Sequence, residues 1–529
     1  MGNPGLKKAA QSDSDQKSIV AAMMEPGFYP KRPAEVTHKE THISHLFFAG
    51  DLVYKIKKAV RFPFLDYSTL GKRRRFLYEE LRLNRRLAPS VYLTIVPITA
   101  TRTGWRLGGS GPVREYVLVM RRLPENRMLP ALIQSGEATP GMMRELAELL
   151  AAFHKQAPPA PPGRTADYPA AVRGAWLANL ADLEPFTGSV LGRDTWAGLK
   201  ELGEVFVDRQ RSLLERRHAG GWIRDVHGDL HCDHVCFAPE GIQVFDCIEF
   251  SRDLRRCDLA SEIAFLVMDL EVRGAGALVE PFLSRYLELV EDRDMPRLLP
   301  FYKAYRALVR GKVGALRGAG DVAAPYFRFA ARYAWDAVKP FLVVVCGLTG
   351  SGKSTLAREL AQRLGMEVIS SDRVRKTAAG VPGAHTVPYG EGLYSPEMTE
   401  RTYAEMAAEA ERRIEEGSGA ILDATYIKRS HREEINRVAA RHRTPVCFIR
   451  CFAPDESVQA RLAERAAKGG DWSDGRWEIF LRQKEEAEPY AGEGENRLDL
   501  DTREPPDSLA ERCERFIRDC LKKAAREPR

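Results

Sequence analysis

The chain has 529 residues, of which 44% are hydrophobic and 29% are charged, and its formal net charge is +7. This composition is typical of a water-soluble protein of two to four domains, and it includes no apolar stretch long enough to span a membrane. The N-terminus lacks a secretory apolar segment, and the nine cysteines, none before Cys232, do not suggest a disulfide framework. We therefore predict a cytoplasmic protein, whose oligomeric state the sequence leaves open.

The positive charge is concentrated in one segment. Lys55 to Arg86 contains eleven Lys or Arg residues against three acids. Such a segment can bind nucleic acid, but it can equally be a solvated helix face or the wall of a site for anionic nucleotides. Few aromatic residues interleave with these charges, which argues against nucleic-acid binding.

The first part of the chain changes from strands to helices. Residues 1–25 are polar and are predicted to be flexible. Period-2 alternation predicts that Lys55 and Lys57 share one face of their strand, with Tyr54 and Ile56 on the other. The predicted strands are His42–Phe48, Leu52–Lys57, Val91–Thr99 and Glu115–Met120, and the main predicted helices are Arg73–Leu87, Gly141–His154, Asp258–Leu270 and Met295–Ala337.

A regular alternation of strands and helices begins after Val338-Lys339-Pro340. Strands are predicted near residues 341–346, 367–370, 419–422, 445–451 and 497–500, with helices between them. This pattern indicates an α/β domain with a mainly parallel sheet. The predicted organisation is a flexible N-terminus (1–25), a first domain (26–337) and an α/β domain (338–529).

The strand at 341–346 is followed by a glycine-rich motif. Gly347–Ser354 satisfies G-x-x-x-x-G-K-[ST], and a helical pattern continues from it. Glycines let the backbone curl so that its N–H groups point at phosphate oxygens, and the helix N-terminus adds positive potential. Lys353 is predicted to reach the β- and γ-phosphates of ATP, and the Ser354 hydroxyl to bind Mg²⁺. The predicted nucleotide-binding residues here are Gly347, Thr349, Gly350, Ser351, Gly352, Lys353, Ser354 and Thr355.

Two acids follow later strands of the same domain. Asp372 comes directly after the second strand, where a carboxylate can accept a proton from an attacking hydroxyl. The competing interpretation is a helix N-cap. Asp423 ends an apolar strand, in a position suited to hold Mg²⁺ through water, with a cap or turn acid as the alternative.

Arginines supply the remaining positive groups. Arg461 and Arg465 lie four residues apart on one helix face, before a glycine-bearing loop at 468–475. They are predicted to clamp the transferring phosphate, and an exposed basic face is the alternative. Arg429 and Arg432 give a weaker signal for binding anionic substrate groups.

The motifs GLTGSGKST, SSDRVRK, ILDATYIKRSHR and RLAER together resemble the P-loop kinases that act on small molecules and polynucleotide ends, including gluconate-type kinases and zeta toxins. The resemblance covers about residues 341–521. It implies ATP and Mg²⁺ as cofactors, Lys353 and Ser354 at ATP-Mg, and Asp372 as the base. It also implies Asp423 as the second-strand acid, with Arg461 and Arg465 as lid arginines.

A second polar cluster spans His227–His234. Asp229 lies seventeen residues before Asp246, which ends a strand. Phosphoryl transfer needs two such acids, one to steer the hydroxyl and one to hold the metal. Two alternatives stay open: a zinc site, because histidines and cysteines are plentiful here, and a polar loop with core cysteines.

HGDLH, VFDCIEF and DLASEIAFL resemble the aminoglycoside phosphotransferase family, which has an α+β, protein-kinase-like fold. The resemblance covers about residues 26–337. It implies Asp229 as the base, Asp246 as a magnesium ligand, and Lys55 on the ATP phosphates with Glu80 (or Glu79) as its helix partner. Five residues after the catalytic Asp, where the family usually has an Asn that binds the metal, this chain has His234. Imidazole is a poorer ligand for Mg²⁺ than an amide oxygen.

The two resemblances in this order are those of bacterial fusions of an aminoglycoside phosphotransferase-like domain with a P-loop kinase. The predicted function is ATP/Mg²⁺-dependent transfer of phosphate to an unidentified hydroxyl acceptor, either a small molecule or a nucleic acid, with two possible kinase sites. The alternatives are a nucleotide-dependent switch with an inactive N-terminal domain, and a nucleic-acid 5′-end kinase.

Overall fold

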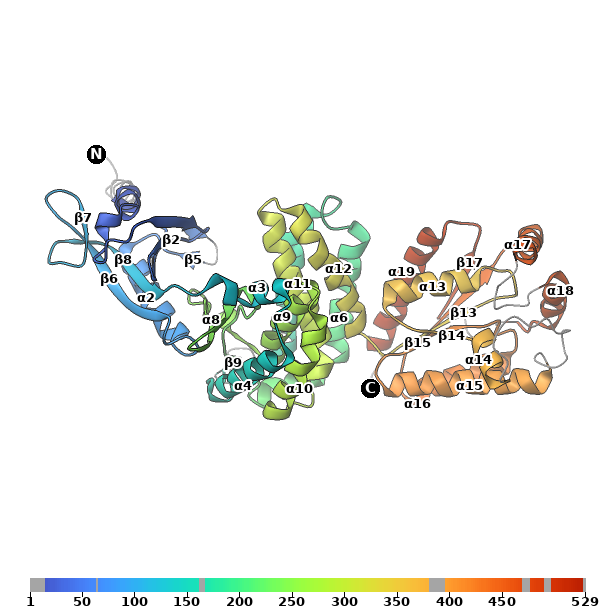
Figure 1. Ribbon diagram of the computed structural model, residues 1–529. Helices are drawn as coiled ribbons and strands as arrows, with labels where there is room; N and C mark the ends of the chain where they lie inside the picture. The colour runs from blue at the N-terminus through green and yellow to red at the C-terminus, as the bar shows by residue number, and fades with distance from the viewer. Residues whose placement is uncertain are drawn as a thin grey trace. The chain divides into compact units, whose positions relative to one another are not determined.

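The computed structural model describes residues 15–62, 65–160, 167–379, 395–468, 476–489 and 496–526 (Figure 1). The predicted tail up to residue 14, and the predicted glycine-bearing loop from residue 469 to 475, lie outside the described residues. The chain divides into two compact units. Unit 1 combines Met1–Ala166 with Leu213–Arg306, and unit 2 combines Asp167–Ser212 with Ala307–Arg529.

The prediction of a flexible N-terminus is wrong for the described part of that segment. Residues 15–23 are helical, and Ile19 and Met23 are buried against the first sheet. Gln16 donates to the Glu115 carboxylate and to the Lys57 carbonyl. Two apolar residues one helical turn apart hold this polar segment against the sheet, although its composition resembles that of a frayed end.

An antiparallel sheet of six strands forms the first part of unit 1, in the order β1-β2-β3-β8-β6-β7. Its faces follow the predicted alternation, because Tyr54 and Ile56 enter one core cluster while Lys55 and Lys57 bond to helix α2 on the other face. The elements are β1 (Val36–Glu40), β2 (Ser44–Ala49), β3 (Leu52–Lys57), β6 (Tyr92–Ala100), β7 (Trp105–Leu107), β8 (Val113–Arg121) and α2 (Leu70–Asn84), with the short pair β4 (Arg61–Phe62) and β5 (Leu65–Asp66).

The rest of unit 1 is mainly helical and carries two short β-ribbons. Helix α9 is almost entirely buried, and the Asp258 side chain caps its N-terminus by accepting a hydrogen bond from the Ala260 N–H. The elements are α3 (Leu129–Ser135), α4 (Pro140–Gln156), α7 (Arg211–Ala219), β9 (Ile223–Asp225), β10 (Val235–Ala238), β11 (Gly241–Val244), α8 (Arg252–Arg255), β12 (Arg256–Asp258), α9 (Leu259–Val272), α10 (Val279–Val290) and α11 (Met295–Leu316), the last shared with unit 2.

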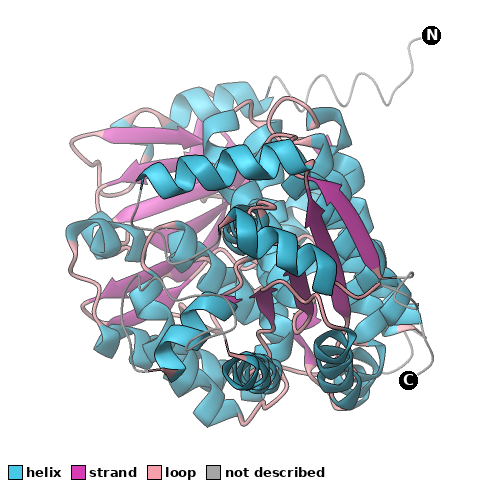
Figure 2. Cartoon of the chain, turned by 90° about the vertical axis from the view of Figure 1, so that its right-hand side faces the viewer, coloured by secondary structure: helices cyan, strands magenta, loops and turns pink. Residues whose placement is uncertain are grey.

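Unit 2 contains a parallel sheet in the order β14-β15-β13-β16-β17. Leu342 and Val344 pack toward α15 and α16, and the other face lies under α13 and α19 (Figure 1). Figure 2 shows by colour that helices lie beside the strands. The elements are β13 (Leu342–Cys346), α13 (Lys353–Leu364), β14 (Val368–Ser370), α14 (Ser371–Ala378), α15 (Pro396–Glu415), β15 (Ala420–Asp423), α16 (Arg429–Arg441), β16 (Val446–Phe452), α17 (Asp455–Lys468), α18 (Trp477–Glu486), β17 (Arg497–Asp501) and α19 (Pro506–Arg526).

Three helices from before residue 338 belong to the same compact unit as this sheet: α5 (Tyr168–Leu183), α6 (Arg193–Arg209) and α12 (Gly320–Ala337). Helix α6 packs on α19, where Glu201 binds Arg518 at 2.6 Å and Lys522 at 2.8 Å. It also packs on α5, where a Cβ at Gly203 would lie 2.2 Å from Trp176 Nε1. The compact unit therefore extends beyond the predicted α/β domain, and the boundary at residue 338 stays a prediction.

Among the described helices, none combines the length and the apolar character needed to cross a membrane.

Candidate functional site

The P-loop of unit 2 leaves the centre of the parallel sheet, between β13 and α13. Gly347 has φ +140°, and a Cβ there would lie 2.2 Å from the carbonyl oxygen of Cys451. Gly350 and Gly352 also have positive φ values, of +75° and +88°. Glycine tolerates these positive φ values and this close contact much better than residues with a Cβ. The backbone conformation of the loop therefore explains why the motif has glycine at these positions. Lys353 follows as the first residue of α13, at the positive end of the helix.

Strand pairing brings the predicted metal acid beside this loop. Asp423 pairs with Val345 of β13 on one side and with Ser370 of β14 on the other. Its side chain is buried, and its Oδ1 has no hydrogen-bond partner among the described residues. Burial raises the pKa of Asp423, while Lys353 and a hydrogen bond from Ser354 lower it. A buried, unpaired carboxylate oxygen next to a serine hydroxyl is a donor set that suits Mg²⁺.

Asp372 lies in the first turn of α14, after strand β14. The N-cap of this helix is Ser370, so the alternative interpretation of Asp372 as the N-cap is wrong. Asp372 Oδ1 lies 3.6 Å from the Arg375 guanidinium. Burial is the main cause of the raised pKa of Asp423, and the charge of Asp372 raises this pKa further.

A cavity of about 380 Å³ lies beside the P-loop, between helix α17 and the segment after β17. Both predicted lid arginines line it. The Arg461 guanidinium donates to Thr502 Oγ1 at 2.9 Å and to the Thr502 carbonyl at 2.7 Å. Thr502 Oγ1 in turn donates to the Ser351 carbonyl at 2.7 Å. In this structure Arg461 is therefore held against the P-loop.

The interpretation of Arg432 as an anion ligand is wrong. Its side chain is fully buried and donates to the carbonyls of Tyr426, Ile427 and Pro489. Arg432 therefore holds the loop after Asp423 in place. Arg429 is exposed and pairs with Glu433 at 2.7 Å along the same helix.

Sequence reasoning missed two contributors to this site. Gln483 of α18 accepts a hydrogen bond from the Thr349 N–H at 2.9 Å, which occupies one of the P-loop amides. Thr502 lines the cavity and links Arg461 to the loop. Both residues are far from the motif in sequence, and no spacing rule connects them to it.

In unit 1, Lys55 of β3 is the centre of a buried ion-pair network. Its Nζ lies 2.7 Å from Glu80 Oε1 and 3.1 Å from Asp246 Oδ1. Lys57 binds the other Glu80 oxygen at 2.6 Å. Burial raises the pKa of Glu80, but Lys55 and Lys57 outweigh it and keep the pKa below its usual value. Of the two helix acids considered, the structure places Glu80 beside Lys55, whereas Glu79 pairs with Arg82 at 2.7 Å.

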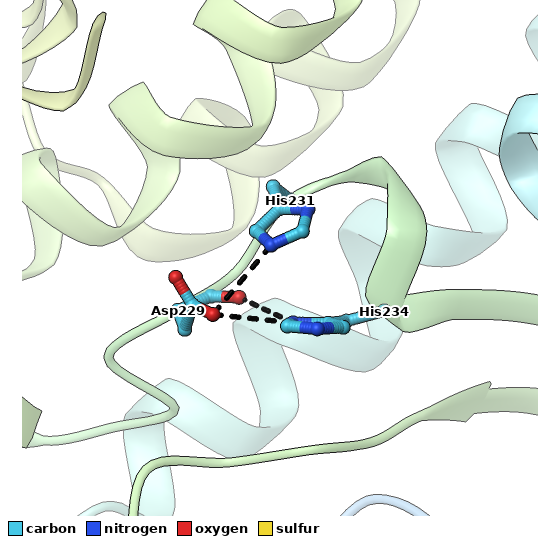
Figure 3. Close-up of side chains that lie close together, drawn as sticks. All are labelled: Asp229, His231 and His234. Carbon is cyan, nitrogen blue, oxygen red and sulfur yellow. Dashed lines mark hydrogen bonds and ion pairs between the residues drawn. The ribbon is translucent and has the colours of Figure 1, made fainter. Parts of the chain in front are cut away.

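Asp229 lies in the loop between β9 and β10, and two histidines turn toward it (Figure 3). Asp229 Oδ2 lies 3.5 Å from His231 Nε2 and 3.6 Å from His234 Nδ1. Burial alone would raise the pKa of Asp229, but a hydrogen bond from His231 and the neighbouring rings hold it well below its usual value. Burial lowers the pKa of His234, which keeps its ring neutral near pH 7.

Groups behind Asp229 hold its loop in place. Glu262 of α9 accepts hydrogen bonds from the N–H groups of His227 at 2.8 Å and of Gly228 at 3.1 Å. Burial raises the pKa of Glu262 to about 7 and lowers that of His227 to about 3. The Asp258 carboxylate forms a buried pair with Arg217 at 2.6 Å. Glu262 and Arg217 were not found from the sequence.

The cysteine thiols of this region do not support the alternative interpretation of a zinc site. All nine cysteines lie within the described residues, and none forms a disulfide. The described groups of three metal-ligating side chains contain only histidine and aspartate: Asp229, His231 and His234, and also His231, Asp233 and Asp269. Burial raises the pKa of the Cys236, Cys247 and Cys257 thiols, which disfavours the thiolates that zinc requires.

Part of the basic segment at residues 55–86 points inward. Lys57 is fully buried, and Arg73 forms a buried pair with Glu115 at 2.9 Å. Arg86 donates to the carbonyls of Asp225 and Val226. The positive charge of this segment therefore builds the interior of unit 1 as well as its surface, and nucleic-acid binding stays a prediction.

The two folds and their sites define a protein that joins a protein-kinase-like phosphotransferase domain to a C-terminal P-loop kinase domain. Residues 55–301 match the phosphotransferase enzyme family, and residues 342–490 match an AAA domain. The chain belongs to the family of the uncharacterized proteins of Mycobacterium tuberculosis and Mycobacterium bovis, to which it is 33% identical over 445 residues. The match covers 82% of this chain and 87% of each relative. The predicted resemblance to a two-kinase fusion is confirmed.

Solved structures of both kinds of kinase are similar to parts of the chain. A choline/ethanolamine kinase family protein from Mesorhizobium loti is 16% identical, with a TM-score of 0.38, and the match covers 60% of this chain and 94% of that chain. A gluconokinase from Sinorhizobium meliloti is 19% identical, with a TM-score of 0.25, and the match covers 35% of this chain and 94% of that chain.

Proposed function

We propose that the chain is an ATP-dependent phosphotransferase whose P-loop site in unit 2 transfers the γ-phosphate to a hydroxyl group. The observation that carries the proposal is the register of three neighbouring strands. It places the P-loop, the buried Asp423 and the start of helix α14 with Asp372 at one edge of the sheet. In parallel α/β sheets, this carboxyl edge is where ligands bind.

The phosphates of ATP bind in the P-loop, with backbone N–H groups and Lys353 against the β- and γ-phosphates. The adjoining cavity, lined by Gly352, Thr355, Arg461 and Thr502, is large enough to hold part of the nucleoside. Arg465 lines the same cavity and adds positive charge near the phosphates. Ser354 and Asp423 would hold Mg²⁺, which supplies charge neutralisation between the β- and γ-phosphates.

Transfer needs an acceptor hydroxyl aligned with the γ-phosphorus. We assign Asp372 to orient this hydroxyl and to accept its proton. A bond forms between the acceptor oxygen and the γ-phosphorus, while the bond from the γ-phosphorus to the β–γ bridging oxygen breaks and releases ADP. The phosphorylated acceptor and ADP are the products.

A second phosphotransfer site in unit 1 is favoured by one observation: Lys55 is already bonded to both Glu80 and Asp246. This arrangement fixes the lysine where it can bind the ATP phosphates. Asp229 is the candidate base there. The competing role for unit 1 is nucleotide binding without transfer.

Both assignments are tested on the full chain with four proteins: wild type, Lys353→Ala, Asp229→Asn and the double variant. Radiolabelled ATP is supplied with panels of aminoglycosides, sugars, nucleosides and 5′-hydroxyl oligonucleotides. For acceptors used by unit 2, Lys353→Ala should lower transfer about 10²–10³-fold. Lys200→Ala, an exposed lysine of α6, is the matched control and should leave the rate unchanged.

The outcomes separate the two sites. Transfer that survives Lys353→Ala but is lost in the double variant belongs to unit 1. Transfer that survives the double variant contradicts both assignments. An acceptor-dependent rate that is lost with Lys353→Ala and unaffected by Asp229→Asn supports unit 2 as the sole transferase and leaves unit 1 with a binding role.

A further inference from the structure

His234 and Asp246 occupy the position at which the family resemblance implies a metal ion in unit 1. We propose that His234 Nε2 and Asp246 Oδ2 together bind a divalent transition-metal ion, with Mn²⁺ preferred over Mg²⁺. This preference rests on the second site proposed above, but it concerns binding and can be measured without catalysis.

A hydrogen bond fixes the orientation and tautomer of the His234 ring. Nδ1 lies 2.8 Å from the carbonyl oxygen of Asp229. A carbonyl can only accept, so Nδ1 carries the hydrogen and Nε2 keeps its lone pair. Histidines that bind metals are commonly held in this way, with the other ring nitrogen donating to a backbone carbonyl. Nε2 is therefore the nitrogen available to a cation.

Nε2 faces the carboxylate of Asp246. The distance from His234 Nε2 to Asp246 Oδ2 is 3.7 Å, which is too long for a hydrogen bond. Two ligand atoms at this separation, each about 2.1 Å from a shared ion, subtend an angle of roughly 120° at the metal. This angle is wider than the angle of about 90° between neighbouring ligands of an octahedral ion, so the two ligand atoms must approach by roughly 0.7 Å to coordinate one Mn²⁺.

The carboxylate is also free to turn one oxygen to an ion. Lys55 Nζ pairs with Asp246 Oδ1 at 3.1 Å, and the other carboxylate oxygen, Oδ2, lies on the side of His234. The Asp246 side chain is 46% exposed and that of His234 is 13% exposed. An ion held here can therefore complete its coordination with water or phosphate oxygens.

The chemistry of the pair argues against Mg²⁺. Magnesium is a hard ion that takes oxygen ligands almost exclusively, whereas imidazole nitrogen suits transition metals. Replacing an oxygen ligand by imidazole therefore weakens Mg²⁺ binding and strengthens binding of Mn²⁺ and later metals. A histidine at this position is unfavourable for Mg²⁺, and its presence is explained if the site binds a transition-metal ion instead.

A neighbouring set of ligands must be distinguished from this pair. Asp229, His231 and His234 have ligand atoms within 4.8 Å of one another (Figure 3). In that set, the His234 nitrogen nearest to Asp229 Oδ2 is Nδ1, at 3.6 Å. Because Nδ1 already donates to the Asp229 carbonyl, its lone pair is not available, and we favour the pair with Asp246.

The test is electron spin echo spectroscopy of the metal-stripped full chain with Mn²⁺ alone. A bound imidazole gives a ¹⁴N coupling, which the oxygen ligands of the P-loop site cannot give. We expect this coupling in the wild-type protein, and we expect Mg²⁺ in large excess to leave it in place. His234→Asn should abolish the coupling and shift the Mn²⁺/Mg²⁺ competition toward Mg²⁺ by roughly tenfold or more.

Two further variants locate the ion. Asp246→Asn should weaken Mn²⁺ binding at this site, and it serves as a second test if His234→Asn does not fold. His231→Asn is the matched control, since its ring centroid lies 4.1 Å from that of His234, and it should keep the coupling. The proposal is overturned by a wild-type protein without ¹⁴N coupling, by easy displacement with Mg²⁺, or by a coupling that His231→Asn removes. A protein that shows the coupling yet transfers no phosphate from unit 1 would contradict the second catalytic site alone.

Discussion

Lys353 in unit 2 and Lys55 in unit 1 are both placed to meet phosphate, but the chain positions them by different means. Lys353 belongs to a continuous loop, where glycines with positive φ and the start of a helix set its place. Lys55 is held by side chains that are 25 and 191 residues away in the sequence. The first site is built by backbone conformation and the second by buried charge, so different substitutions should damage each one.

The largest effect is expected from the acid assigned to move the proton in unit 2. Asp372→Asn should lower kcat about 10²–10⁴-fold for acceptors used by that unit, with little change in KM for ATP. Steady-state kinetics, with an acceptor found by the screen proposed above, measures both constants. Asp182→Asn, an exposed aspartate that pairs with Lys312 in the same unit, is the control. A rise in KM for ATP at unchanged kcat would assign Asp372 to nucleotide binding instead.

In unit 1, the comparison predicts a large loss of stability when one buried charge is removed. Glu80→Gln removes the carboxylate that Lys55 and Lys57 share. Because Lys55 keeps Asp246 and Lys57 keeps Glu249, we expect the cost to lie at or below the lower end of the range of about 3–5 kcal/mol found for a buried charge left unpaired. Hydrogen exchange of the β3 and α2 peptides measures the local opening free energy. Glu79→Gln, one residue away in an exposed pair with Arg82, should cost no more than about 1 kcal/mol. Equal effects of the two variants would contradict the buried-charge account.

Backbone geometry should matter most in unit 2. Gly347→Ala places a Cβ 2.2 Å from the Cys451 carbonyl and also strains a φ of +140°. The matched control is Gly417→Ala, which has a φ of +77° with no atom within 4 Å of the added Cβ. Relative to the control, Gly347→Ala should cost about 1–3 kcal/mol more in unfolding free energy and should abolish nucleotide binding. Urea unfolding and binding of a fluorescent ATP analogue check the two effects, and similar behaviour of both variants would refute the close-approach argument.

The predicted effect that is smallest near neutral pH is a pH dependence in unit 1. Burial lowers the pKa of His154 to about 3, whereas the unfolded chain binds the proton near pH 6.5. The unfolded state is therefore favoured as pH falls from 6.5 toward 3, by up to about 1.4 kcal/mol per pH unit for one group. His154→Gln removes this proton, so its unfolding free energy should fall less steeply over that range. Parallel curves for the two proteins, measured by urea unfolding, would show that His154 does not titrate in this way.

The difference between a site built by local backbone conformation and one built by distant side chains also explains what could be predicted from the sequence. The parallel strands and the P-loop were predicted closely, because apolar runs and a glycine motif are local signals. The faces of β3 followed from alternation alone. The resemblance implied Glu80 as the partner of Lys55, with Glu79 as the alternative, and in the structure Glu80 lies beside Lys55.

Other features depend on contacts that no local pattern records. Gln483 and Thr502 reach the P-loop from distant segments, and Arg432, which looked like an anion ligand, is buried among carbonyls. The helical segment at residues 15–23 was missed, because its few apolar residues stand among polar ones. Tertiary packing decided each of these cases.

The discontinuous make-up of unit 2 has a consequence for how the chain is synthesised. Helices α5 and α6 leave the ribosome early, yet α12 and α19, with which they share a compact unit, follow much later. At ordinary rates of translation, the face of α6 that carries Glu201 must wait roughly 15–60 s for α19 to emerge. During that interval the nascent chain presents an unfinished surface, so the order of synthesis favours completing unit 1 before unit 2 can close.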